Sequence, residues 1–225
     1  MRRRILLPLL LATSFLTSCS QKFTASQREK LTTLTLSPVV EVENAYTDPQ
    51  GAADGTMSAV TTATGGGLIG ALIGATTEAV QNSSFKGKEG AKFGRLRQLS
   101  PQSVSSNVGV EVQKALRANP FTASRLRLKS DNKVVTEVQR FTLTRVGKRP
   151  DGQLLMAPQI VAKVEIVDGA DKKIGTWPLV AGVSSDARTV SEWVADRKGL
   201  QKAYKEAAVA VGRNFATNLA AKTAE

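Results

Sequence analysis

The chain has one cysteine, Cys19, and this limits how its fold can be stabilised. Without a second thiol, no disulfide can form within the chain. A length of 225 residues is nevertheless enough to bury a sizeable apolar core. We therefore expect a fold that is held together by packed apolar side chains, and we predict a single domain over residues 31–225.

The first 18 residues have the pattern of an export signal. Arg2, Arg3 and Arg4 precede an apolar run that begins at Ile5. This run has about 12 residues and is interrupted by Pro8, so it is shorter than the roughly 20 residues that a membrane-spanning helix needs. We predict that residues 1–18 are a signal peptide, and that a polar tether over residues 19–30 connects it to the domain.

The signal segment ends in Leu16, Thr17 and Ser18, followed by Cys19. This motif resembles the lipobox of bacterial lipoprotein signal peptides. The resemblance implies cleavage before Cys19 and acylation of both its thiol and its new amine, and three acyl chains hold a protein stably on a membrane. The alternative is an ordinary secretory signal with an incidental cysteine. Because Ser20 rather than Asp follows the cysteine, the resemblance implies an outer-membrane lipoprotein that faces the periplasm.

The chain is basic, with a net charge of +12. The predicted signal peptide carries three of the 31 Lys and Arg and none of the 19 Asp and Glu, so its removal leaves a net charge of +9. Such a charge favours anionic lipid head groups or acidic polysaccharide as partners. We do not expect an exported protein to bind nucleic acid.

Residues 57–80 form the most unusual segment of the mature chain. Small residues recur every four positions, at Gly66, Gly70 and Gly74 and, beside them, at Gly67 and Ala71. In a helix these positions share one side, while apolar side chains cover the other side. The pattern resembles the glycine-zipper segments of bacterial envelope proteins, in which small residues let helices pack closely.

The surroundings of this segment leave several interpretations open. No charged residue occurs from Met57 to Thr77, which is long enough to cross a bilayer as a helix. About half of these residues are Gly, Ser or Thr, so insertion would be only marginally favourable. The alternatives are a membrane-inserted or membrane-lying zipper, a helical hairpin packed on the domain's own core, and an oligomer interface.

A basic linker is predicted over residues 85–97. Its cations are Lys86, Lys88, Lys92, Arg95 and Arg97. Cations beside a membrane-seeking segment can contact lipid phosphates, so these residues are our candidate contacts for an anionic lipid or polysaccharide. The alternative is a solvated, charged linker.

The remaining segments predict strands. Apolar residues alternate at Leu34, Leu36, Val40 and Val42, which indicates a strand that Pro38 marks as an edge or a bulge. Further strands are predicted over residues 134–146, 160–166 and 174–183, and a turn over residues 168–173 joins the last two.

Two helices complete the prediction. Ser100 can cap a helix that begins at Pro101 and stops at Asn119. Apolar residues recur every three or four positions over residues 200–219, which indicates a final amphipathic helix. The order of elements predicts the α+β class: an antiparallel sheet of about four strands with helices on one face, and a Gly/Ala-rich helical insertion.

This order resembles small α/β lipoproteins of the bacterial envelope, including the curli secretion lipoprotein family. The resemblance rests on the lipobox, Pro38 in the first strand, the strands from Val138 to Val183 and an Ala-rich final helix. In that family the subunits form a ring, and segments of each subunit span the outer membrane. The resemblance implies that residues 57–80 are such a segment, but this candidate is helical rather than part of a barrel.

Few residues are candidates for catalysis or metal binding. The chain has no histidine, and acylation would leave no free thiol. Two Ser-x-x-Lys matches, Ser83–Lys86 and Ser130–Lys133, fall in polar loops. We therefore predict no enzyme activity, no catalytic residue, no metal site and no cofactor.

Three functions agree with these features. The first is a structural or assembly lipoprotein that binds a protein partner or a second copy of itself. The second is a component of a membrane transport or secretion complex with residues 57–80 in the bilayer. The third is a binder of a lipid or cell-wall ligand. All three place the protein in the bacterial envelope, attached to a membrane by its lipid.

Overall fold

The computed structural model describes residues 22–43, 45–47, 92, 95, 96, 98, 99, 101 and 103–224. Several predicted features lie outside the described residues: Leu16, Thr17, Ser18, Cys19, the segment at 57–80 with Gly66, Gly67, Gly70, Ala71 and Gly74, and three of the basic residues, Lys86, Lys88 and Arg97.

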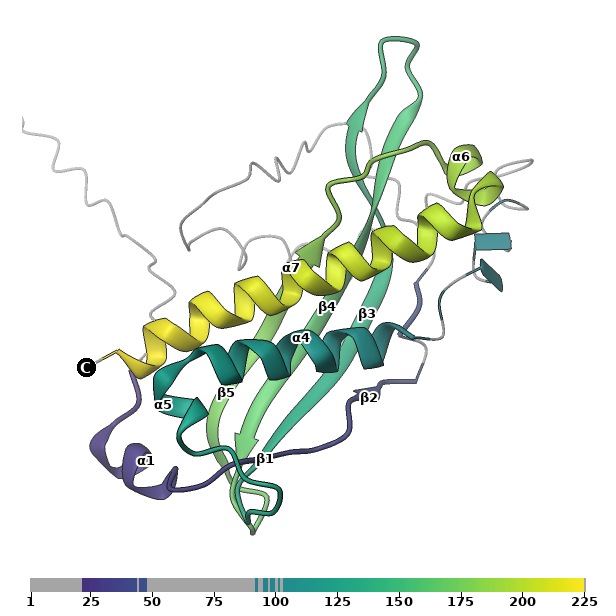
Figure 1. Cartoon of the computed structure of the whole chain (residues 1–225). Helices are drawn as coiled ribbons and strands as arrows, with labels where there is room; N and C mark the ends of the chain where they lie inside the picture. The colour runs from purple at the N-terminus through teal and green to yellow at the C-terminus, as the bar shows by residue number, and fades with distance from the viewer. Residues whose placement is uncertain are drawn as a thin grey trace, which may run out of the picture.

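A five-stranded sheet forms one layer of the domain (Figure 1). Its main part consists of β3 (Lys133–Lys148), β4 (Leu154–Val167) and β5 (Lys173–Val183), which pair antiparallel in chain order. Two short strands, β1 (Thr35–Leu36) and β2 (Val40–Glu41), both pair parallel with β3. The α+β class is confirmed, but the sheet is mixed rather than wholly antiparallel.

The first predicted strand is divided at Pro38, which has no N–H to donate to a ladder. Leu34 is completely buried before the break, whereas Val40 is 54% exposed after it. Val39 packs against the core instead, with a methyl group close to Gly109. The expectation that Val40 faces the core is therefore wrong: Val40 and Glu41 are both exposed, and the partly buried Val39 and Val42 on either side of them pack against the core, so the alternation does not continue past Pro38.

Two long helices, α4 (Val104–Ala118) and α7 (Arg197–Thr223), lie side by side across one face of the sheet (Figure 1). Three short helices flank them: α1 (Ala25–Lys30), α5 (Pro120–Ala123) and α6 (Val190–Ala195). Helices on one face were expected and are confirmed. Among the described residues, no helix has both the length and the apolar character that crossing a bilayer requires.

The helix predicted from Ser100 begins later than expected. Its N-cap is Ser103, which makes no side-chain capping hydrogen bond, and the first helical residue is Val104. Its predicted end is correct, because Asn119 leaves the helical conformation and starts α5 instead. The apolar residues Val104, Val108, Val112 and Leu116 are spaced by four and are all buried.

Residues 22–30 are folded against the domain rather than forming a polar tether. The Phe23 N–H donates to the Lys222 carbonyl oxygen at 3.0 Å, and its side chain is 5% exposed. Thr24 and Gln27 then form a reciprocal capping box that begins α1. The part of the predicted tether at 22–30 is thus integral to the fold.

The described residues of the predicted basic linker, at positions 92, 95 and 96, are helical. Leu96 is 1% exposed and joins the main apolar core. Lys92 donates to the hydroxyl of Ser191 in α6 at 2.9 Å. This part of the stretch therefore packs on the domain.

Candidate functional site: a cationic pocket

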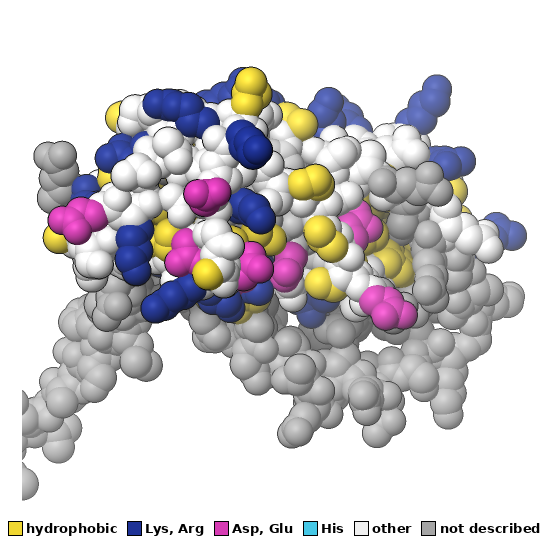
Figure 2. Space-filling view, turned by 90° about the horizontal axis from the view of Figure 1, so that it is seen from below, with side chains coloured by type: hydrophobic (Ala, Val, Ile, Leu, Met, Phe, Trp, Pro, Cys, Tyr) yellow, Lys and Arg dark blue, Asp and Glu magenta, His cyan; other side chains and the backbone are white. Residues whose placement is uncertain are grey.

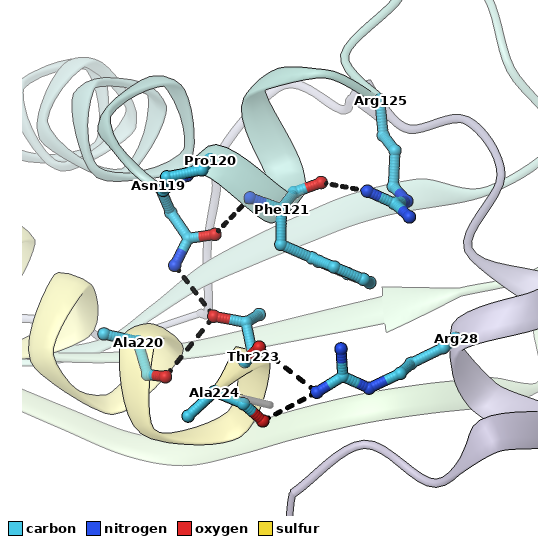
Figure 3. Close-up of a pocket in the computed structure, with 8 residues that line it drawn as sticks. All are labelled: Arg28, Asn119, Pro120, Phe121, Arg125, Ala220, Thr223 and Ala224. Atoms are coloured by element: carbon cyan, nitrogen blue, oxygen red, sulfur yellow. Dashed lines mark hydrogen bonds between the residues drawn. The ribbon is translucent and has the colours of Figure 1, made fainter.

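A pocket of about 590 Å³ lies where α1, α5 and the end of α7 meet (Figure 3). The residues that line it are Arg28, Asn119, Pro120, Phe121, Arg125, Ala220, Thr223 and Ala224. They come from three segments that are far apart in the sequence. Among the residues that the structure describes, this lining includes two arginines and no carboxylate.

Asn119 connects the helices that line the pocket. Its side-chain oxygen accepts from the N–H groups of Phe121 and Thr122, at 3.1 and 3.3 Å, and so caps α5. Its amide nitrogen donates to the hydroxyl of Thr223 at 2.9 Å. Asn119 thereby ends α4 through its backbone, while its side chain caps α5 and connects it to the last turn of α7.

Arg28 closes the side of the pocket next to the C-terminal end of α7. Its Nη2 donates to the carbonyl oxygens of Thr223 and Ala224, at 3.1 and 2.7 Å. These carbonyls carry the partial negative charge of a helix C-terminus, which a guanidinium stabilises. A hydrogen bond from the Gln27 side-chain amide to the Ile174 carbonyl oxygen, at 2.7 Å, holds α1 in position beside β5.

Arg125 lies over the ring of Phe121, with its guanidinium carbon 3.8 Å from the ring centre. Arg28 is 5.3 Å from the same ring centre. Arg125 also donates to the Phe121 carbonyl at 2.6 Å, so its position is fixed by a hydrogen bond as well as by the cation–π contact. The ring thus keeps two cations close together at one site.

Aromatic rings connect the pocket to the core. Phe23 stacks on Phe121 at 6.1 Å and meets the edge of Trp177, which in turn contacts Phe215 in α7. Lys222 lies 4.9 Å from the Trp177 ring centre, and burial lowers the pKa of its amine. The cations at this end of the domain therefore lie against a cluster of packed aromatic rings.

This arrangement suits an anion. Guanidinium groups recognise carboxylates and phosphates through several N–H donors, and within the described part of the chain no acidic side chain lines the pocket. The Thr223 hydroxyl already donates to Leu219 O at 2.9 Å and accepts from Asn119. The lining residues offer binding groups and do not present an activated nucleophile.

The predicted anion contacts do not form this pocket. Lys92 donates a hydrogen bond to Ser191 in α6, and Arg95 is exposed in the same described helical stretch. The pocket is lined by α1, α5 and the last turn of α7, and Figure 1 shows these elements at the opposite end of α7 from α6. Arg28 was expected in a tether, and Arg125 was not among the predicted contact residues. The sequence signal that pointed to this part of the pocket was Asn119-Pro120, because this pair ends one helix and can cap the next.

A second charged cluster lies on β3, β4 and β5. Glu165 accepts from Lys163 and Lys173, both at 2.8 Å, and Lys163 also reaches Glu137 at 3.4 Å. Glu165 alternates with the buried Val164 and Ile166, so the cluster lies on the face away from the helices. Among the described residues, no group of three Asp, Glu, His or Cys side chains is placed to hold a metal ion.

Glu165→Gln is expected to lower the free energy of unfolding at neutral pH by about 1–2 kcal/mol, because two charge-assisted hydrogen bonds are weakened. Burial acts to raise the pKa of Glu165, but the hydrogen bonds from Lys163 and Lys173 together outweigh it, so the net pKa is lowered. A lowered pKa contributes stability above the unfolded value of about 4.3, and this contribution is lost as the pH falls through the folded value.

The measurement is urea unfolding of wild type and Glu165→Gln at a series of pH values. The difference between the two proteins should shrink on acidification. Glu137→Gln serves as a control with a smaller effect, because the Glu137 side chain is more exposed, at 32% against 9%. A difference that is the same at acidic and neutral pH would contradict this account.

No protein-family model matches the chain, and no curated protein matches it. Among solved structures, the chain is similar to a Xanthomonas campestris protein described by the family model DUF330, with a TM-score of 0.34 and 15% identity. That match covers 50% of this chain and 58% of the other, which is less than two thirds of it.

A second solved structure is a Caulobacter crescentus protein that is provisionally described as a lipoprotein. It has a TM-score of 0.34 and 15% identity and covers 57% of this chain and 95% of the other. Similarity at this level carries no argument about function. The lipobox, the glycine zipper and the resemblance to the curli secretion lipoprotein family therefore stay predictions.

Proposed function

We propose that this protein is a lipid-anchored, non-catalytic component of the bacterial envelope. Its α+β domain is held directly at the membrane surface, where it binds an anionic group. The observation that carries the proposal is the position of Phe23. This residue is packed in the core and bonded to Lys222, only four residues after Cys19.

Four residues of fully extended chain span about 14 Å. A tether over residues 19–30 would have allowed roughly three times that reach. With acyl chains on Cys19, the domain would stay within a short distance of the lipid head groups. This supports a function at the membrane surface rather than one that searches the periplasm on a long linker.

The pocket supports binding as the domain's activity. It joins two guanidinium groups to an aromatic base, and Arg28 lies five residues after Phe23, at the same end of the domain. An anionic group at the membrane surface would thus meet the pocket without large movement of the domain.

Cys19→Ala is expected to abolish acylation and membrane attachment, because no other residue of the chain carries a thiol. The measurement is the intact mass of the mature protein together with its partition between the detergent and aqueous phases of Triton X-114. Wild type should carry the mass of the acyl chains and enter the detergent phase.

Ser18→Ala is the matched control, because it keeps a small residue before the cleavage point and should leave acylation unchanged. Recovery of an unacylated wild-type protein, or of Cys19→Ala in the detergent phase after cleavage of residues 1–18, would contradict lipid anchoring through Cys19.

A further inference from the structure

The loop after α5 presents an apolar tip between two cations. Leu128 is fully exposed, and its neighbours Arg127 and Lys129 are exposed as well. A single exposed leucine is common on protein surfaces. Here, however, it shares a loop with the pocket residue Arg125, so apolar and cationic groups are presented together.

Hydrogen bonds hold this loop in place. The Thr35 hydroxyl donates to the Leu128 carbonyl at 3.2 Å, and the hydroxyls of Thr33 and Ser130 are 2.8 Å apart. Asn132 donates to the carbonyls of Lys30 and Thr33, at 2.8 and 3.0 Å. The exposed position of Leu128 is thus a fixed feature of the fold, shared with the segment from α1 to β1.

The loop, the pocket and the start of the described chain lie at one end of the domain. Leu126 bridges to Leu34, and both Arg28 and Arg125 contact the Phe121 ring, on which Phe23 stacks. Figure 2, seen from below, shows many Lys and Arg side chains around the domain, with apolar and acidic side chains between them. Acidic residues also lie here: Asp131 belongs to the loop, and Asp168 and Asp171 belong to the β4–β5 turn, whose Gly169 lies against Asp131.

From this placement we propose that the end of the domain carrying Leu128 and the Arg28–Arg125 pocket docks on a bilayer of anionic phospholipid. Leu128 enters the head-group region, Arg127 and Lys129 contact lipid phosphates, and the pocket accepts the phosphate of one head group. The inference rests on the proposed function, because acylated Cys19 brings this end to the membrane at high effective concentration.

The combination follows the physical chemistry of peripheral membrane proteins. An apolar side chain gains by leaving water, and flanking cations gain from the negative surface potential of anionic lipids. Each cation near such a surface raises the membrane–water partition coefficient of the domain about fivefold. The short chain segment between acylated Cys19 and Phe23 restricts the domain to orientations in which this end can reach the head groups.

The experiment uses the mature, acylated protein in vesicles of phosphatidylethanolamine and phosphatidylglycerol that contain nitroxide-labelled phospholipid. Acylated Cys19 has no free thiol, so Leu128→Cys can be labelled specifically with an apolar fluorophore, which keeps an apolar group at the tip of the loop. The matched label is Gln153→Cys, which is exposed near the tip of the β3–β4 hairpin at the other end of the domain (Figure 1). We expect stronger quenching at position 128 than at position 153.

Equal or stronger quenching at position 153 would overturn the proposed orientation. Equally strong quenching at position 128 in vesicles of phosphatidylcholine alone would overturn the requirement for anionic lipid. If soluble glycerol phosphate raises the Tm while position 128 is not quenched in anionic vesicles, the pocket serves a soluble phosphate and membrane docking is wrong.

Charge variants test the individual contacts. Arg127→Gln with Lys129→Gln should lower the ratio of docked to undocked protein about 25-fold, because two cations leave the surface. Arg145→Gln with Lys148→Gln removes the same charge from the hairpin and should leave quenching at position 128 unchanged. Equal effects of the two pairs would overturn a specific docking surface.

Arg125→Gln tests the pocket. In an otherwise wild-type background, this substitution should also reduce quenching at position 128. Near-UV circular dichroism should show that the aromatic core is intact. No reduction in the folded variant would overturn the head-group site in the pocket. A protein that is not acylated at Cys19 fails at the mass measurement, so failure of the anchor is distinguished from failure of the docking surface.

Discussion

Gly182→Ala is expected to lower the free energy of unfolding by about 3 kcal/mol or more, the upper range for overpacking of a core. Gly182 lies in β5 directly beneath α7, and a Cβ there would overlap the Ala207 carbonyl oxygen and the Val211 backbone nitrogen. Helix backbone cannot rotate away as a side chain can. The whole helix would have to move off the sheet.

The measurement is urea unfolding, and the matched control is Gly147→Ala. A Cβ at Gly147 in β3 would meet only Leu155 Cδ1, at 3.9 Å, which is an ordinary contact. The control should therefore change stability by no more than about 0.5 kcal/mol. Equal effects of the two substitutions would show that α7 is not pressed against the sheet as described.

Trp193→Ala is expected to cost about 3–5 kcal/mol, the range for removing a buried aromatic side chain. Trp193 in α6 is completely buried, its Nε1 donates to the Met156 carbonyl at 2.8 Å, and Arg188 covers its ring at 4.7 Å. Arg188 is held in turn by Asp186 and Asp196. Loss of the ring would leave a cavity beneath α6.

Trp193→Phe separates packing from hydrogen bonding. The Met156 carbonyl would keep a donor, because it also accepts from the Arg188 N–H at 3.0 Å. We therefore expect a cost of about 1–2 kcal/mol, well below that of the alanine variant. Unfolding can be followed through Trp177, the remaining tryptophan. Equal losses for the two variants would show that the hydrogen bond dominates over packing.

Local periodicity predicted much of the fold. In β4, Ile160, Ala162, Val164 and Ile166 are all completely buried, as their alternation indicated, although Val161 and Glu165 on the other face are also buried, at 5% and 6% exposure. In α7, the predicted stripe is buried throughout, at Leu200, Tyr204, Ala208, Val211, Phe215 and Leu219. These predictions were correct because a strand and a helix bury side chains at fixed intervals, and those intervals are written in the order of residues.

Features that depend on distant contacts were not predictable in the same way. The parallel pairing of β1 and β2 with β3 joins segments roughly one hundred residues apart, and their short patterns carry no direction. Residues 22–30 are polar enough to read as a tether. Tertiary contacts, such as those of Phe23 with Phe121 and Trp177, show that this segment is part of the domain.

By itself, the sequence determined the α+β class, the positions of the main strands and helices and the need for a packed core without disulfides. Tertiary structure alone decided that Arg28, Phe121, Arg125 and Thr223 share one pocket. The physical reason is that amphipathic periodicity is a local property, whereas a binding site forms where chain segments meet. Here the meeting point is the end of α7, where Asn119 and Arg28 are bonded to Thr223.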